Sequence, residues 1–313
     1  MTLYIFRRLL ATLPVMVVVT VFVFFLLRLA PGDPAAIIAG EDATDVVIAA
    51  VRAKLGLDRP VLEQFALWVW GLLHGDFGTS IFSNLPVSRL IAQRIEPTLA
   101  LSLATLVVAV SLAVPIGVLA AWKAHRLVDR AVMVFAVMGF ALPGFLVGYV
   151  LIWVFAVKLG WLPVQGYRPI AEGFWPFAQG LVLPAVTLGI TYMALIARIT
   201  RASMLEVLSQ DYIRTANSKG LATTRVLLLH ALKNAAVPIV TVIGIGVALL
   251  ISGVVITETV FNIPGLGRLT VDAVLKRDYP IVQGLIIVFA LVKVVVNLLV
   301  DISYAFLDPR IRY

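Results

Sequence analysis

Residues 98–121 read TLALSLATLVVAVSLAVPIGVLAA, a stretch without a single charged side chain. About 20 consecutive apolar residues are enough for a helix to cross the hydrocarbon core of a bilayer. Because hydrocarbon offers no water to backbone N–H and C=O groups, a chain that crosses it must form helices or a closed barrel. An unbroken apolar run of this length favours a helix, so the stretch predicts a transmembrane helix.

The rest of the chain repeats this pattern. Similar apolar runs occupy residues 9–30, 131–157, 181–197, 236–256 and 281–301. Of the 313 residues, 61% are hydrophobic and 13% are charged, whereas soluble domains are about 45–50% apolar and about 25% charged. We therefore predict an all-α, polytopic membrane protein with six transmembrane helices. The first run exceeds the roughly 7–15 residues of a signal-peptide core and predicts an uncleaved anchor helix.

The distribution of charge predicts the orientation. With six spans, both termini lie on one side, together with the segments 122–130 and 198–235. This side holds 13 lysines and arginines in 67 residues, whereas the opposite side holds 10 in 114 residues. Cytoplasmic loops carry the excess of lysine and arginine, so both termini are expected in the cytoplasm. The basic cytoplasmic loops of a membrane protein then explain the net charge of +8, so this charge does not indicate a nucleic-acid partner.

The predicted spans divide the chain into two parts. Residues 1–97 are expected to form an N-terminal anchor helix followed by an extracytoplasmic helical segment, in which one helix ends at Gly56 and another begins after Pro60. Residues 98–313 are expected to form a five-helix core. This core includes a long cytoplasmic loop over residues 198–235.

This cytoplasmic loop is longer than a connection between two spans requires. Its pattern predicts a short helix over residues 203–208, a second helix that Asp211 caps and Gly220 ends, and a third helix after Thr223 or Thr224. Exposed apolar and basic residues favour a docking surface for a partner protein over a simple cap on the bundle. A DNA-binding helix-turn-helix is remote between two spans. The docking candidates are Asp211, Tyr212, Arg214, Thr215, Ala216, Lys219, Gly220 and Leu221.

Within the predicted spans, one pattern concerns the packing of helices and another concerns a translocation route. Small residues recur every four positions on one face of the second span and predict close packing against another helix; they are Ala109, Ala113, Gly117 and Ala121. Polar residues are sparse, and the candidates to line a translocation route are Thr187, Thr191, Tyr192, Thr241, Ser252, Lys293 and Asn297. Lys293 is the ionisable residue near the middle of a span, so it recognises a substrate, meets a structural partner or snorkels.

The sequence offers little for catalysis. It contains no cysteine, which excludes thiolate chemistry and cysteine-ligated metals. The three histidines, His74, His125 and His230, are far apart, no H-E-x-x-H motif occurs, and no metal site is predicted. A G-x-x-x-x-G-K-[ST] phosphate loop is also missing, so the chain cannot itself be an ATP-driven motor. Midplane carboxylates or inverted repeats, which an ion-coupled transporter should show, are not visible.

The inner loop carries the most specific signature. The run Asp211-Tyr212-Ile213-Arg214-Thr215-Ala216-Asn217-Ser218-Lys219-Gly220-Leu221, followed by His230-Ala231-Leu232-Lys233-Asn234-Ala235 and Pro238, resembles the cytoplasmic loop of bacterial ABC importer permeases, most of all the branch for dipeptides, oligopeptides, glutathione or nickel. Further motifs resemble that branch in its order: Pro31-Gly32-Asp33-Pro34, Leu55-Gly56-Leu57-Asp58, Gly75-Asp76-Phe77-Gly78, Gly160-Trp161-Leu162-Pro163, Phe261-Asn262-Ile263-Pro264-Gly265-Leu266-Gly267 and Asp308-Pro309-Arg310-Ile311-Arg312-Tyr313. The resemblance covers nearly the whole chain. Arg214 and Thr215 depart from the general pattern, which has glutamate and alanine there.

This resemblance implies a permease subunit with the fold of type I ABC importers, in which the loop over residues 198–235 docks onto an ATPase subunit. It implies as partners a homologous second permease subunit, two ABC ATPase subunits that hold ATP and Mg²⁺, an extracytoplasmic solute-binding protein and the bilayer of the bacterial inner membrane. No cofactor is expected on this chain. The expected cargo is a dipeptide, oligopeptide or glutathione. The alternatives are a nickel chelate or another small solute and, less favoured, an autonomous secondary transporter.

Overall fold

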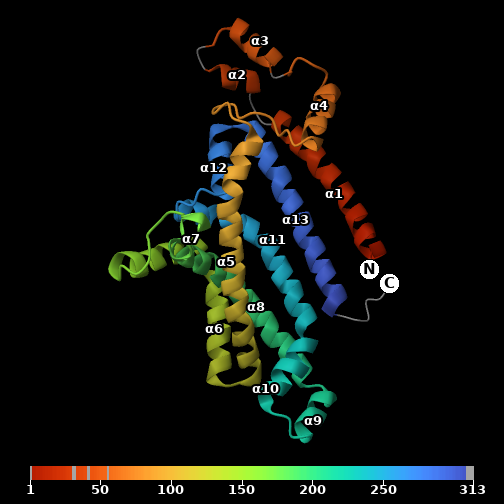
Figure 1. Ribbon diagram of the computed structural model, residues 1–313, viewed down its shortest axis with the longest axis vertical. Coiled ribbons are helices and arrows are strands. Elements are labelled where there is room, and N and C mark those ends of the chain that lie inside the picture. Colours follow the sequence, from red (N-terminus) through yellow and green to blue (C-terminus); the bar gives the residue numbers. More distant parts are fainter. Residues whose placement is uncertain (1, 30–32, 41–42, 55, 308–313) are drawn as a thin grey trace. The chain divides into compact units, whose positions relative to one another are not determined.

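The structure, a computed structural model, describes residues 2–29, 33–40, 43–54 and 56–307. Within these ranges the regular elements are helices, joined by loops that include one isolated β-bridge between Thr79 and Pro86 (Figure 1). The chain forms two compact units. Of the described residues, the first unit contains 2–6, 95–268 and 293–307, and the second contains those within 7–94 and 269–292.

Most elements of the second unit come from the N-terminal third of the chain. The helices that contribute to it are α1 (Thr2–Leu29), α2 (Pro34–Ala39), α3 (Asp45–Lys54), α4 (Val61–Leu73), the first turns of α5 (Val87–Trp122), most of α12 (Leu266–Lys276) and the first half of α13 (Tyr279–Leu307). Gly56 has a φ of +65° just after α3, and Pro60 is the N-cap of α4. The two predicted helices on either side of residues 56–60 are thus confirmed.

The first unit holds the remaining elements. They are the rest of α5, α6 (Leu127–Ala141), α7 (Gly144–Leu151), the π-helix η1 (Ile152–Lys158), the 3-10 turn η2 (Ile170–Glu172), α8 (Phe174–Leu208), α9 (Asp211–Ser218), α10 (Thr223–Arg225), the π-helix η3 (Val226–Leu232), α11 (Ala236–Val260), the start of α12 and the second half of α13. The 35-residue α8 is about 50 Å long, since an α-helix rises about 1.5 Å per residue. It therefore extends beyond a hydrocarbon core of about 30 Å.

Several helices have the length and composition of membrane spans. Among the described residues, α5, α8 and α13 are each long and apolar enough to cross a membrane alone. If each of two bent helix pairs counts as one span, the number of spans rises to five. Helix α1 adds a shorter apolar stretch over Leu10–Phe25. The expected third span over residues 131–157 is not one continuous helix. It breaks into α6 and α7 with a bend of 106°, because Pro143 at the N-cap of α7 has no N–H to continue the ladder.

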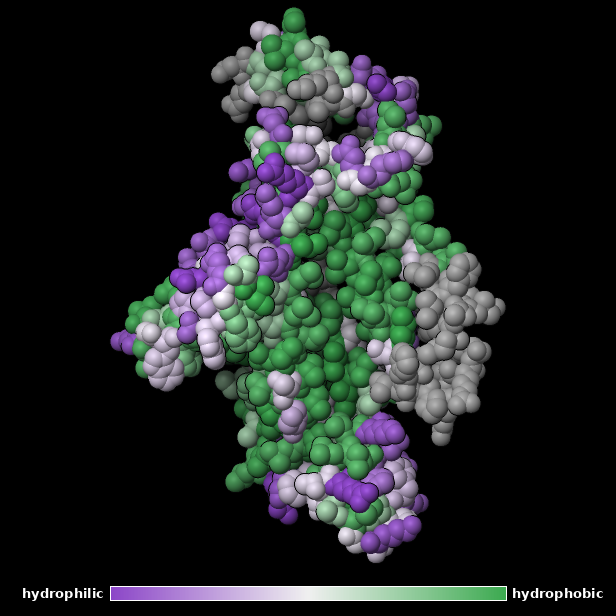
Figure 2. Space-filling model, in the orientation of Figure 1, coloured by the Kyte–Doolittle hydropathy of each residue, from purple (hydrophilic) through white to green (hydrophobic). Residues whose placement is uncertain are grey.

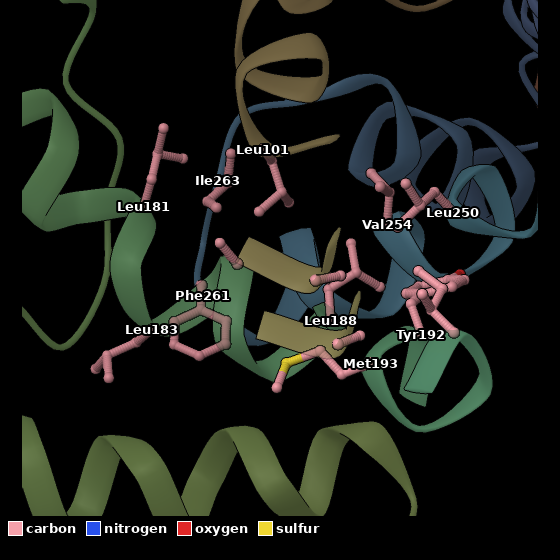
Figure 3. Packing of buried hydrophobic residues seen from close by; sticks show 14 of the residues in the cluster. Leu101, Leu181, Leu183, Leu188, Tyr192, Met193, Leu250, Val254, Phe261 and Ile263 are labelled. Atoms are coloured by element: carbon pink, nitrogen blue, oxygen red, sulfur yellow. The ribbon is translucent and has the colours of Figure 1, made fainter. Parts of the chain in front are cut away.

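The hydrophobic core of the first unit lies where α5, α8 and α11 meet, with η1 against them. Figure 3 shows Leu188 and Tyr192 of α8 near Val254 of α11, and Phe261 and Ile263 from the loop after α11 in the same cluster. The small residues of α5 are buried in this unit. At Gly117 an added Cβ would come within 2.6 Å of Thr200 Cβ on α8, so the predicted close packing is confirmed.

Candidate functional site

The candidate docking loop begins as a continuation of α8. Residues 198–208 extend this helix without a break, so the prediction of a separate short helix over residues 203–208 is wrong. No glycine or proline occurs between Ala197 and Leu208 to stop the helix. Ser203 and Met204 are also buried there. The chain then turns at Ser209 and Gln210 into α9.

Helix α9 has a buried face and an exposed face. Ile213 is 2% exposed and Ala216 is 7% exposed, and both belong to a cluster with residues of α5, α8, η3 and α11. Leu221 packs against the same cluster. Ala216 is therefore buried rather than exposed as expected, and Leu221 is partly buried, because the single chain packs both against this cluster. Contact of either residue with a partner protein stays a prediction.

The turn after α9 has a defined hydrogen-bond pattern. The N–H of Gly220 donates to the C=O of Asn217 at 2.9 Å, and the N–H of Leu221 donates to the C=O of Ala216 at 3.4 Å. This pair of bonds is the Schellman motif, which places a residue of positive φ at the position after the helix cap. Gly220 has a φ of +72°, as the sequence predicted. The predicted third helix also forms, as α10 and η3.

The exposed face of α9 offers polar and basic groups. Tyr212, Arg214, Thr215 and Lys219 are exposed, with Tyr212 44% exposed. Asp211 forms an ion pair with Arg214 at 3.4 Å, but both side chains are largely exposed, so the pair contributes little to stability. Figure 2 shows hydrophilic residues gathered over α9 and α10, next to the hydrophobic surface over α8 and α11. The arrangement is a short helix whose exposed face carries polar and basic groups.

A buried ion pair that the sequence analysis missed supports this region. Arg201 on the extension of α8 contacts Asp129 in the first turn of α6, where its Nη2 donates to Oδ2 at 2.7 Å. The N–H of His125 donates to the same oxygen at 2.9 Å. The hydrogen bond from Arg201 holds the pKa of Asp129 below its ordinary value, although burial opposes this shift. The only sequence signal was an acid in an otherwise basic loop.

The candidate pathway residues lie in different environments. Thr187 and Tyr192 are buried in the core of the first unit, where an added Cβ at Gly246 of α11 would lie 3.4 Å from the Tyr192 ring. Thr191 donates to the C=O of Gly139 on α6 at 3.3 Å. Thr241 donates to the C=O of Val237 within α11. The side chain of Ser252 lies outside the described residues. A route lined by these groups stays a prediction.

Two further pathway candidates lie on the surface. Lys293 and Asn297 are exposed on α13, whereas Asp301, one helical turn further, is buried. In a single chain, therefore, Lys293 is not enclosed with Thr187 and Tyr192. Its role stays a prediction, and the surface of α13 is where a lipid or another subunit would meet it.

The comparisons with known proteins agree on one family. Residues 113–313 match the family described as "Binding-protein-dependent transport system inner membrane component", and residues 1–104 match the corresponding N-terminal component. The chain is 53% identical, over the full length of both proteins, to the "Probable peptide ABC transporter permease protein y4tP" of Sinorhizobium fredii (strain NBRC 101917 / NGR234). It is 45% identical, over 99% of each protein, to the "Glutathione transport system permease protein GsiC" of Escherichia coli (strain K12) and of Salmonella typhi.

Proposed function

The chain belongs to the family of inner membrane components of binding-protein-dependent transport systems, and on this premise we propose that it is one permease subunit of an ATP-driven importer for small peptides. Helix α9 is the observation that carries the proposal. Its buried face is anchored in the chain's own core, and its exposed face is basic. The relatives named for peptide and for glutathione transport support a peptide cargo.

The anchoring of α9 suits a mechanical role. Ile213 and Ala216 pack against residues from α5, α8 and α11, so a force applied to α9 reaches three long helices at once. The sequence has no phosphate loop, and the motor is therefore a partner, an ABC ATPase that holds ATP and Mg²⁺. Its docking groove should offer a slot for Tyr212 and acidic groups for Arg214 and Lys219.

The complete assembly would contain this chain, a homologous permease subunit, two ATPase subunits and an extracytoplasmic solute-binding protein, in the bacterial inner membrane. Six spans and cytoplasmic termini fit the charge distribution. Because the chain has no native cysteine, Ser83→Cys and Ser218→Cys can report the topology. An impermeant thiol reagent should label the first from outside intact cells and the second only after permeabilisation. The reverse pattern would overturn this topology.

The transport experiment uses the full complex in proteoliposomes, with ATP inside and the binding protein outside. Uptake is measured for two peptide probes, radiolabelled glutathione and radiolabelled alanyl-alanine. Uptake of a nickel chelate is measured as well, because it represents the alternative class of cargo. We expect ATP-dependent uptake of at least one peptide probe, and no uptake when the ATPase subunits are left out. Uptake without the ATPases would indicate an autonomous transporter, and uptake of the nickel chelate alone would contradict the peptide cargo.

Docking through α9 can be tested separately from transport. Arg214→Glu reverses one charge on the exposed face, while the buried anchor residues are unchanged. This variant should fold normally but retain less ATPase during purification. Glu206→Gln, at an exposed position near the end of α8, is the matched control. Equal retention by parental protein and Arg214→Glu would show that Arg214 takes no part in docking.

A further inference from the structure

The last turn of α11 contains a fully buried carboxylate. Glu258 is 0% exposed. A buried carboxylate is costly unless it is paired or hydrogen-bonded, and the C-terminal end of a helix is an unfavourable place for a negative charge. Its presence there therefore needs a physical explanation.

Groups from two other segments contact this carboxylate. The hydroxyl of Thr98 on α5 donates to Oε1 at 2.5 Å, and the N–H of Arg268 donates to Oε2 at 2.9 Å. Thr98 Oγ1 in turn accepts the N–H of Leu266 at 2.8 Å. Both amides belong to the first turn of α12, where N–H groups lack helical partners and the helix dipole favours an anion. Glu258 thus joins α11 to α5 and to the start of α12.

The loop between α11 and α12 is shaped around this carboxylate. The N–H of Ile263 donates to the C=O of Glu258 at 2.9 Å. A Cβ added at Gly265 would overlap the carboxylate, and one at Gly267 would come within 2.6 Å of Val255 Cα. The two glycines therefore leave the space that Glu258 occupies. Phe261 and Ile263 of the same loop are fully buried in the core of the unit.

The opposite end of α11 lies at the docking loop. This helix has 25 residues, a length of about 37 Å. At its N-terminal end, Ala235 and Ile239 share a cluster with Ile213 and Ala216 of α9. One continuous helix therefore connects the anchor of α9 with the carboxylate of Glu258.

We propose that Glu258 is a positioning residue for transport: its carboxylate fixes the end of α11 to α5 and to the first turn of α12, so that a displacement of α11 that begins at α9 is transmitted rather than lost at the helix end. This inference rests on the proposed function. It assigns Glu258 no contact with the cargo. Without the carboxylate, ATP hydrolysis should continue while uptake per ATP falls.

The test uses the full complex with its ATPases and binding protein, and compares Glu258→Gln with the parental protein. Two quantities are measured: uptake of radiolabelled glutathione or alanyl-alanine per ATP hydrolysed, and hydrogen exchange of residues 261–268. Glutamine retains the size of the side chain but replaces one acceptor oxygen by a donor. Since hydrogen bonds to a charged group are among the stronger ones, we expect uptake per ATP to fall by roughly tenfold and exchange in this segment to become faster.

Milder variants and controls keep the test decisive if Glu258→Gln does not assemble. Thr98→Val removes one hydroxyl without changing the size of the side chain, and it should lower uptake per ATP in the same direction but less. Thr98→Ser keeps the hydroxyl and should match the parental protein. Glu96→Gln removes an exposed carboxylate on the same helix, which accepts a hydrogen bond from Tyr167 at 3.0 Å, and it should also match.

Each outcome has a defined meaning. Lower uptake per ATP together with faster exchange supports the inference. Faster exchange with unchanged uptake per ATP shows that Glu258 is only structural, and unchanged exchange shows that it does not hold the segment; either result overturns the inference. If the parental complex shows no ATP-dependent uptake of either probe, the proposed function fails and this inference fails with it.

Discussion

Gly220 and Gly265 each lie in a turn that follows a helix of the first unit, yet they are glycines for different reasons. Gly220 has a φ of +72°, and nothing lies within 4 Å of an added Cβ. Gly265 does not adopt a positive φ, and its Cβ would overlap the carboxylate of Glu258. The turn after α9 therefore requires a backbone conformation, whereas the turn after α11 requires space.

This difference matches what surrounds each turn. The turn after α9 faces outward, so a partner can contact it without disturbing the core. The turn after α11 is packed around a buried charge and is joined to two other helices through Glu258. A change in the first turn should therefore affect a partner's binding, and a change in the second should affect the fold.

The largest expected effect is that of Gly265→Ala. The new methyl group would displace a buried carboxylate from its donors, and overpacking combined with a poorly paired buried charge costs about 3 kcal/mol or more. Thermal unfolding of the purified protein in detergent measures the loss. Gly220→Ala is the matched variant, and equal shifts in Tm would contradict the distinction between the two glycines.

The next effect concerns the ion pair behind α9. Asp129→Asn leaves Arg201 without its carboxylate and should cost about 1–3 kcal/mol, with a lower Tm and weaker retention of the ATPases. Asp301→Asn, at a buried acid on α13, shows whether the loss of any buried acid has the same consequence for the ATPases. We expect weaker retention only for Asp129→Asn.

The same pair predicts a pH dependence. The hydrogen bond from Arg201 lowers the pKa of Asp129 in the folded protein. A carboxylate with a lowered pKa stabilises the fold above its unfolded pKa of about 3.9, and this stabilisation is lost as the pH falls through the folded pKa. The difference in Tm between parental protein and Asp129→Asn should be steady from about pH 5 to about pH 8 and shrink below about pH 4. A difference that grows on acidification would refute this assignment.

A smaller effect is expected at Gly220. Alanine there must adopt a left-handed conformation, which costs about 1–2 kcal/mol, and Gly220→Val should be worse because its side chain is β-branched. Gly220→Asn should be near parental, because asparagine tolerates positive φ. Copurification of the ATPase subunits, with Tm as the control for folding, measures the series. Equal retention of the ATPase subunits by all three Gly220 variants would show that docking does not depend on the shape of this turn.

The smallest effect is expected from Asp211→Asn. The exposed pair with Arg214 contributes little to stability, so Tm should not change. Removal of the acid makes the exposed face of α9 more basic, and ATPase binding should become tighter by roughly twofold at low salt if the groove is acidic. Weaker binding after this substitution would indicate that the groove is basic at this position.

The prediction of the docking loop from sequence was correct for the turn at Gly220. It was wrong for the start of α9, where Gln210 and not Asp211 is the N-cap and no side-chain cap hydrogen bond forms. Gly220 ends α9 because glycine alone adopts positive φ without a steric penalty, and such a rule can be applied without knowledge of the fold. The prediction failed for Ala216, which was expected on the surface. The direction in which a short helix turns its apolar residues depends on which neighbours pack against it, and those neighbours come from α5, α8 and α11.

The sequence by itself determined that this protein is helical, that it lies in a membrane and that α9 ends at Gly220, because apolar length and glycine act over a few residues. Only the tertiary structure decided that Glu258 and Asp129 are held in buried hydrogen-bonded sites. Arg201, the side-chain partner of Asp129, lies 72 residues away, and Thr98, the side-chain partner of Glu258, lies 160 residues away. A short pattern of residues does not encode such distant contacts. The physical reason is that a buried carboxylate requires hydrogen-bond donors close to it in space, and these donors need not be close to it along the chain.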